Sequence, residues 1–223
     1  MNNILNPENK FFSVIRKIVY ILFLSVLWTI CSIPILTIGP ATAALYYAVV
    51  KSVRKERSYP VKEFFKEFKR NAKQGIFLTI IFIVVGFASG WADYLILLPS
   101  LKLENAIDFL CALLLTVKVL LFLSVLIHAF PLISRFRVKN LKVLENSLAL
   151  SVTELPKTVL LILIVAVSLM MCSMELLLLG VIPAATVLII SYILEPIYQK
   201  YYQETDLDGS NGILDPWYDN EKC

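Results

Sequence analysis

The chain has 223 residues, of which 58% are hydrophobic and only 17% are charged, and its net charge is +4. A soluble domain is nearer a quarter charged, whereas the mean hydropathy here is +0.76. These figures exclude a disordered chain, a small disulfide-bonded scaffold and an ordinary cytosolic enzyme, and they predict an all-α, polytopic transmembrane helical bundle.

The first apolar run covers residues 18–50 and is interrupted at Pro34 and at the Gly39–Pro40 pair. Because a helix needs roughly 20 apolar residues to cross the hydrocarbon core, the run forms either one span or two. Two spans, at residues 18–36 and 40–54, keep the basic N-terminus and the next loop on one side of the membrane. One span puts them on opposite sides and leaves residues 39–50 as a re-entrant or interfacial segment.

Residues 60–74 have the pattern of an amphipathic helix that is apolar on one face and basic on the other. The apolar stripe consists of Val61, Phe64, Phe65 and Phe68, and the basic face includes Lys66, Lys69 and Arg70. Such a helix is expected in the inner membrane interface, with its rings among acyl chains and its cations near anionic headgroups. It serves either as a connector between spans or as a docking helix for a cytoplasmic partner.

The rest of the chain predicts four further spans. Residues 76–98 and 106–128 are two plain apolar runs, and a third run of 36 residues covers 159–194 with Glu175 near its middle. One helix of that length would reach roughly 54 Å, so we expect a hairpin that turns near residues 174–180, with spans at 157–174 and 178–198. A second short helix is expected near residues 140–151, with Leu141, Leu144 and Leu148 on one face.

The distribution of positive charge favours six spans over five. With six spans, every lysine and arginine except Lys102 and Lys118 faces the cytoplasm, as the positive-inside rule requires. Five spans would put the basic N-terminal residues outside. We therefore expect a multi-pass protein of the cell membrane with both termini in the cytoplasm, consisting of one transmembrane domain over residues 1–203 and an acidic tail over 204–223.

Lys118 is the basic residue that this topology does not explain, because it falls in the middle of the span at 106–128. A charge there costs ~2.5–3.5 kcal/mol on insertion scales and usually has a partner or faces a wet cavity. Asp93 and Asp108 are the candidate partners, although Asp108 is too far along the same helix for a direct pair. Lys118 is predicted to form a structural ion pair, to snorkel, or to contact a solute or protein partner.

Small residues and prolines mark the candidate sites of helix breaks and close helix packing. Pro34, Gly39 and Pro40 would break a helix, at a tight outer hairpin or at a substrate cavity. Gly86 and Gly90 form a G-x-x-x-G pattern, which permits close approach of another helix.

No pattern in the sequence points to catalysis. Phosphate-loop, zinc-protease and nucleophile-elbow motifs are missing from the sequence, so we expect no enzyme, no cofactor and no metal site. His128, the single histidine, and the cysteines have no ligand-type spacing. The cations of residues 60–74 share a helix with apolar anchors, so the predicted partner is an anionic lipid surface and not nucleic acid.

Three blocks of the sequence resemble the YesL-like family of bacterial membrane proteins of unknown function. They are residues 28–46 (WTICSIPILTIGPATAALY), 64–75 (FFKEFKRNAKQG) and 130–136 (FPLISRF), and the resemblance extends roughly over residues 10–200. It implies a protein typical of Gram-positive bacteria, with a role associated with sugar import and a carbohydrate transporter complex as partner. It supplies no catalytic residues.

Two functional hypotheses follow. The first is a non-enzymatic accessory or regulatory membrane protein, associated with carbohydrate uptake. The alternative is a small-solute transporter or channel component for a sugar or oligosaccharide, with Lys118 and the break at residues 34–40 lining its path. A continuous polar cavity that reaches Lys118 would favour transport, and a solid apolar core would favour the accessory role.

Overall fold

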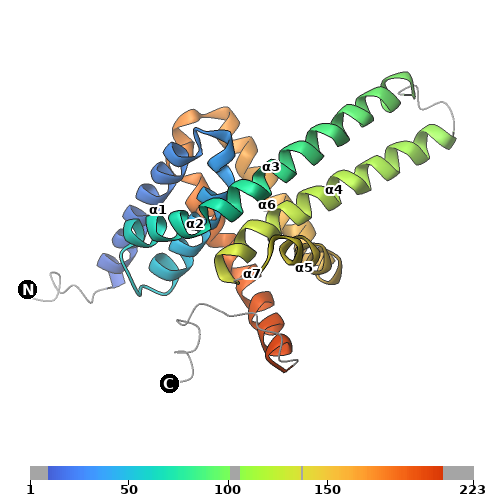
Figure 1. Ribbon diagram of the computed structural model, residues 1–223. Coiled ribbons are helices and arrows are strands. Elements are labelled where there is room, and N and C mark those ends of the chain that lie inside the picture. Colours follow the sequence, from blue (N-terminus) through green and yellow to red (C-terminus); the bar gives the residue numbers. More distant parts are fainter. Residues whose placement is uncertain (1–9, 101–105, 137, 208–223) are drawn as a thin grey trace, which may run out of the picture.

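The computed structural model describes residues 10–100, 106–136 and 138–207, and these residues form helices and no strand (Figure 1). In chain order the elements are α1 (Lys10–Ser32), η1 (Ile35–Thr37), α2 (Ile38–Ala48), η2 (Val49–Arg54), α3 (Pro60–Ser100), α4 (Ala106–Arg135), α5 (Asn140–Thr153), α6 (Leu155–Met174), η3 (Leu176–Gly180) and α7 (Ile182–Leu207). Two of the short elements, η1 and η3, are 3₁₀ turns, and η2 is a π-helical turn.

Five of these helices are long and apolar enough to cross a membrane, within Phe12–Ser32, Pro60–Tyr94, Phe109–Arg135, Leu155–Met174 and Ile182–Lys200. The predicted all-α polytopic bundle is therefore confirmed. Most of the side chains on these helices are exposed within the single chain, as they would be among lipid acyl chains.

The chain reverses direction between α1 and α2. Pro34 cannot continue an α-helix, and α1 ends at Ser32. The Thr37 hydroxyl donates to the carbonyl oxygens of Cys31 at 2.6 Å and Pro34 at 2.7 Å, which satisfies groups that the end of the helix leaves free. The reversal brings Trp28 of α1 beside Thr42 of α2, and its indole Nε1 donates to the Thr42 hydroxyl at 3.2 Å.

The α2–η2 segment, residues 38–54, returns beside α1. Its far end lies at the start of α1, because Glu56 pairs with Arg16 at 2.5 Å and with Lys17 at 2.7 Å. The basic start of α1 and the loop after η2 thus lie at the same end of the molecule, as two crossings in residues 10–54 require. The segment is too short to count among the five long apolar helices, and nearly all of it is buried. The sixth crossing stays a prediction.

Glycines allow α2 and α3 to cross with their backbones in contact. A Cβ on Gly39 would lie 2.1 Å from Thr79 Oγ1 and 2.7 Å from the Gly75 carbonyl oxygen, and a Cβ on Gly75 would lie 2.7 Å from the Pro40 nitrogen. This crossing positions the first turns of α3 against α2.

The predicted helix at residues 60–74 is present, but it is the first part of a longer helix and not a separate element. It continues without a break into the following span, so α3 has 41 residues. Pro60 starts the helix, where its missing N–H costs nothing, and no later proline interrupts it before Pro99. Figure 1 shows α3 and α4 side by side as a long hairpin that projects from the other helices.

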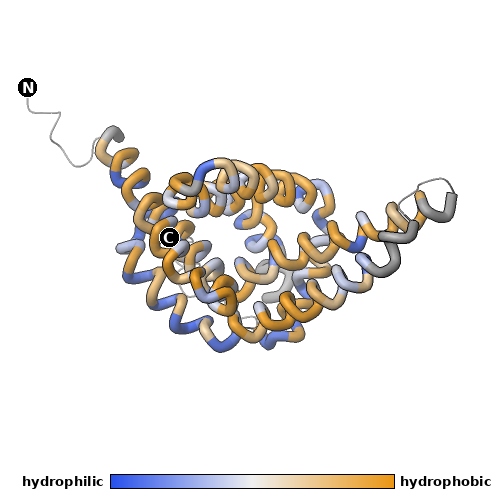
Figure 2. Tube along the Cα trace, turned by 90° about the horizontal axis from the view of Figure 1, so that it is seen from above, coloured by the Kyte–Doolittle hydropathy of each residue, from blue (hydrophilic) through white to orange (hydrophobic). Residues whose placement is uncertain are grey.

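The hairpin predicted near residues 174–180 is formed by α6, η3 and α7. Glu175 ends α6 and is exposed at the turn. The start of α7 is fixed to α1, because the Ser25 hydroxyl donates to the Val181 carbonyl oxygen at 3.0 Å and accepts from the Ala184 N–H at 3.0 Å. Seen from above, the helices form a ring from which the α3–α4 hairpin extends (Figure 2).

The predicted second short helix corresponds to α5, and its predicted leucine face is largely exposed within the chain. Leu141 and Leu148 are 80% and 55% exposed, whereas Val143 and Ser147 are fully buried. The leucines repeat at helical spacing, yet α4 packs against the neighbouring face. The pattern therefore located the helix but not its covered side.

Candidate functional site

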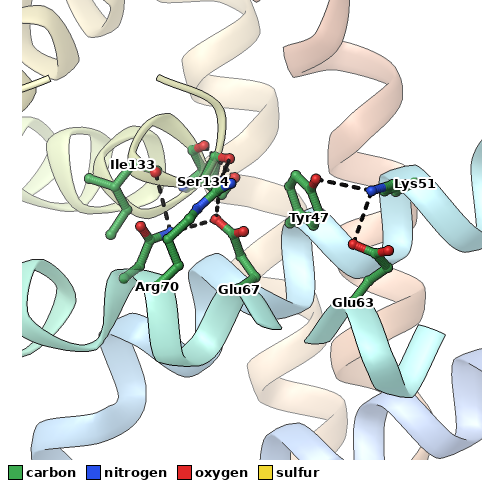
Figure 3. A network of polar contacts seen from close by, with 9 residues as sticks. Tyr47, Lys51, Glu63, Glu67, Arg70, Ile133 and Ser134 are labelled. Carbon is green, nitrogen blue, oxygen red and sulfur yellow. Dashed lines mark hydrogen bonds and ion pairs between the residues drawn. The ribbon is translucent and has the colours of Figure 1, made fainter. Parts of the chain in front are cut away.

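Charged side chains gather where α2–η2, the start of α3, the end of α4 and α7 meet. The first set joins η2 to α3 (Figure 3). Lys51 Nζ lies 3.0 Å from Glu63 Oε2 and donates to the Tyr47 hydroxyl at 3.3 Å. The ammonium also lies 5.2 Å from the centre of the Tyr47 ring, within the range of a cation–π contact.

The second set joins α3 to the end of α4 (Figure 3). Glu67 is fully buried, and its Oε1 accepts from Arg70 Nη2 at 2.6 Å and Asn71 Nδ2 at 2.7 Å. The same donors reach the carbonyl oxygens of Ser134 and Ile133, each at 3.3 Å. A buried carboxylate is stable only when it is paired and hydrogen-bonded, and this arrangement supplies both conditions.

The third set joins α4 to α7 and α2 in the interior. Arg135 Nε donates to Glu195 Oε1 at 2.9 Å, and Arg135 Nη2 pairs with Glu195 Oε2. The Tyr46 hydroxyl donates to Glu195 Oε1 at 2.8 Å. Arg135 and Glu195 are each 2% exposed, so removal of either partner would leave a buried charge, at a cost of roughly 3–5 kcal/mol.

Arg54 adds a further link between η2 and α7. Its Nη1 donates to the Ser191 carbonyl oxygen at 2.7 Å, and its guanidinium lies 4.6 Å from the centre of the Tyr192 ring. Together the contacts of Lys51, Arg54, Arg70 and Arg135 turn four basic residues inward, although charge counting alone assigns them to the cytoplasmic surface. These contacts combine three ion pairs with hydrogen bonds of Arg54 and Arg70 to backbone carbonyl oxygens, and they hold helix ends together.

Glu56 holds the start of α1 to the loop after η2. Its carboxylate pairs with Arg16 and Lys17 and accepts from the Ser13 hydroxyl at 3.2 Å. The hydrogen bond from Lys17, assisted by Arg16 and Ser13, holds the pKa of Glu56 below its ordinary value. Glu56 has a φ of 53°, in the left-handed region that side-chain-bearing residues rarely adopt.

Lys118 pairs with Asp93, one of its two predicted partners, on the projecting α3–α4 hairpin. The Lys118 side chain is 44% exposed and the Asp93 side chain 19% exposed. Neighbouring Val117, Val119 and Leu120 are exposed apolar side chains. The structure therefore puts the pair on a lipid-type surface; the side chain of Asp108 lies outside the described part of the structure.

The predicted packing residues have different surroundings. Gly39 and Pro40 are buried at the α2–α3 crossing, and Pro34 is exposed at the turn before η1. A Cβ on Gly86 would lie 3.2 Å from Phe122, whereas a Cβ on Gly90 would meet nothing within 4 Å. Within this chain the close crossing thus uses Gly39 and Gly75 and not Gly90.

The predicted interfacial stripe is divided between the interior and the surface. Phe64 is fully buried and Phe68 is partly buried against the same core, whereas Val61 and Phe65 are 39% and 41% exposed. Lys66 and Lys69 are exposed. We call the exposed side chains Val61, Phe65, Lys66 and Lys69 the outer face of α3.

The cavities among the helices differ in their linings. An apolar cavity of about 230 Å³ is bordered by α1, α2, α4, α6 and α7, with Trp28, Tyr46, Phe130, Ser168 and Thr186 in its wall. A second space of about 850 Å³, the basic cavity, opens between α3 and the α4–α5 connection. Its wall carries the cations Arg70, Lys73 and Lys139, the amides Asn71, Gln74 and Asn140, and the apolar side chains Phe77, Ile133, Phe136 and Val138.

Among the described residues, Lys118 lines neither cavity. His128 is fully buried and its Nδ1 lies 2.8 Å from the Ser124 carbonyl oxygen. In the described ranges, no three His, Cys, Asp or Glu side chains gather as a metal site would require.

The comparisons with known proteins find similarity to proteins of unknown function. A family described as "Protein of unknown function, DUF624" matches residues 18–91. The chain is also 29% identical over 189 residues to "Uncharacterized protein YteU" of Bacillus subtilis (strain 168), a match that covers 82% of this chain and 79% of that protein.

The resemblance to the YesL-like family is confirmed. No solved structure matches the chain.

Sequence reasoning missed the buried charged pairs. Glu195 stands next to the apolar run of α7, and an ionisable residue in such a run is a candidate site by default. Glu63 and Glu67 are four residues apart within a basic segment, so they share one helix face. Both signals were available, but the partners come from distant segments that the sequence does not bring together.

Proposed function

We propose that the protein is a non-enzymatic integral membrane protein with an accessory or regulatory role, associated with carbohydrate uptake. The outer face of α3 is its proposed contact surface for a transporter complex. The observation that carries this proposal is the way α3 is held. Its inward face is fixed by Glu63, Phe64 and Glu67, so Val61, Phe65, Lys66 and Lys69 are presented on a rigid helix.

The chemistry of this outer face suits a partner at the membrane surface. Exposed phenylalanine and valine side chains offer apolar contact, and the lysines beside them attract acidic protein surfaces and anionic headgroups. A cell-membrane location with both termini in the cytoplasm would place these side chains at the cytoplasmic surface of the membrane. The association with carbohydrate uptake rests on the family resemblance.

The buried charges also support a structural role for the interior. Arg135 with Glu195, and Arg70 with Glu67, direct their charges at one another. The residues predicted to line a transport path lie in different environments. Lys118 pairs with Asp93 on an exposed surface, whereas Gly39 packs against α3. The transporter alternative therefore has less support. Counterflow of a labelled sugar in proteoliposomes would overturn the accessory role in its favour.

The test is co-purification of the full chain after mild solubilisation from its native membrane. We expect a transporter subunit to be recovered with the protein, and expect Lys66→Gln/Lys69→Gln to reduce that recovery. The matched control, Lys142→Gln/Lys200→Gln, removes two exposed lysines from other helices and should leave recovery unchanged. A photo-crosslinking residue at Phe65 should capture the same subunit.

Repeated purification without any protein partner would contradict the accessory role. The carbohydrate association is tested separately, by uptake of labelled sugars in cells that lack the protein. Unchanged uptake over a broad panel of mono- and oligosaccharides would remove that part of the proposal while leaving the contact surface to be judged by the co-purification.

A further inference from the structure

We propose that the basic cavity binds the phosphate group of one anionic phospholipid. The cavity measures about 850 Å³, and its described wall includes Lys73, Lys139 and Arg70, of which Arg70 is already paired with Glu67. Phosphate oxygens are strong acceptors for ammonium and guanidinium donors. This is a discrete site, distinct from the outer face of α3, and it does not depend on the accessory role.

The wall of the cavity is held in place by hydrogen bonds. Asn71 is 6% exposed and donates to the Ile133 carbonyl oxygen at 3.3 Å. Gln74 Nε2 donates to the Val138 carbonyl oxygen at 2.8 Å. These bonds tie α3 to the α4–α5 connection, so the cations that line the space from both sides are held near one another before a ligand arrives.

The start of α5 adds to the positive potential. Lys139 is the N-cap residue and makes no side-chain cap hydrogen bond, and both Lys139 and Asn140 line the cavity. The N-terminal end of a helix carries a partial positive charge. It therefore reinforces Lys73 and Lys139, which are the main determinant of the site.

The apolar surface beside the cavity favours a phospholipid over a soluble phosphate compound. Phe77 lines the cavity one turn after Lys73, and Ile80, Val84 and Phe87 continue from it along the same side of α3. Phe77, Ile80, Val84 and Phe87 are 49%, 42%, 60% and 73% exposed. A headgroup in the cavity would thus leave an acyl chain against a continuous apolar stripe.

The test uses native mass spectrometry of the full chain from nanodiscs that contain equal amounts of phosphatidylglycerol and phosphatidylcholine. We expect one retained phosphatidylglycerol per chain. Because a lysine near the surface is worth about a fivefold change in affinity for an anionic lipid, Lys73→Gln/Lys139→Gln should weaken retention by roughly 25-fold. The control, Lys62→Gln/Lys157→Gln, removes two exposed lysines outside the cavity and should bind as the unaltered chain does. Circular dichroism checks that both variants fold.

Equal loss in the two double variants would overturn the proposal, because it would mean that the lipid responds to total charge alone. Equal retention of phosphatidylcholine would overturn it as well. Titration with inorganic phosphate and with glycerol phosphate identifies the source of the phosphate. Binding of either as tight as that of the lipid would assign the cavity to a soluble anion and overturn the phospholipid assignment.

Discussion

At the scale of single residues, we expect different effects from replacing Lys118 and from replacing Asp93, the two partners of one ion pair. Lys118→Ala should leave insertion intact, because Asp93 lies near the predicted outer end of its span, where its carboxylate can reach water. Asp93→Ala should lower the yield of folded protein, because it leaves Lys118 unpaired in mid-span at a cost of ~2.5–3.5 kcal/mol on insertion scales. Fluorescence-detected size exclusion of membrane extracts measures the yield.

The double variant, Lys118→Ala/Asp93→Ala, is the control for this prediction. It should recover most of the yield that Asp93→Ala loses, since no charge is then left unpaired. Equal yields from all three variants would mean that the pair contributes nothing. We also expect Lys118→Ala to impair the physiological role, and a fully active variant would show that Lys118 has none.

Glu56 makes the attachment of the first turns of α1 dependent on pH. Its pKa is lowered in the folded chain, chiefly by the hydrogen bond from Lys17. The contact therefore stabilises the fold above the ordinary pKa and is lost as the pH falls through the lowered pKa. A spin label at Val14, which is 55% exposed, should remain restrained from pH 7 down to the ordinary pKa of a glutamate, about 4.3, and gain mobility only at lower pH.

Glu56→Gln keeps the shape of the side chain and removes its charge. The label at Val14 should then be mobile at every pH, without the acid transition. A label at Ile30, at the other end of the same helix, should report no change in either protein. A transition of equal size at both positions would indicate general acid unfolding instead of loss of the Glu56 contact.

At the scale of elements, the packing of α2 on α3 depends on two glycines. Gly75→Ala places a methyl group 2.7 Å from the Pro40 nitrogen, a backbone atom that cannot rotate away. We expect a loss of stability at or above the ~1–3 kcal/mol typical of overpacking, measured as a fall in the thermal midpoint in detergent. Gly90→Ala meets open space and should stabilise the helix by roughly 0.5–1 kcal/mol. Similar midpoints for both variants would contradict this crossing.

The elements themselves were largely predictable from the sequence, because their signals are local. Pro34 ends α1, and the turn at Glu175 divides the last long run into α6 and α7. The covered faces were less predictable, since a helical stripe does not reveal which neighbour covers it. Leu141 and Leu148 of α5 are exposed although they repeat at helical spacing. The pairing of Arg135 with Glu195 joins residues 60 apart, and no local pattern encodes that distance.

At the scale of the whole molecule, the ion pairs around Glu56 favour six crossings over five. In the five-crossing topology, the start of α1 and the loop after η2 lie on opposite sides of the membrane. In the structure, however, Arg16 and Lys17 of α1 both contact Glu56 of that loop. Other contacts bring the remaining helix ends to the same region, because Arg54 reaches Ser191 and Arg70 reaches Ser134. The α2–η2 segment has 17 residues and would rise roughly 25 Å as a helix, close to the thickness of the hydrocarbon core.

We therefore expect single cysteines at Val14 and Tyr59, in a chain whose native cysteines are replaced by serine, to resist a membrane-impermeant maleimide until the cells are permeabilised. A cysteine at Ile33, which is 76% exposed between α1 and η1, and one at Glu175 should react in intact cells. Labelling of Val14 from outside while Tyr59 stays protected would restore the five-crossing topology. It would also show that the Glu56 contacts do not form in the membrane, because no ion pair can join residues on opposite sides of a bilayer.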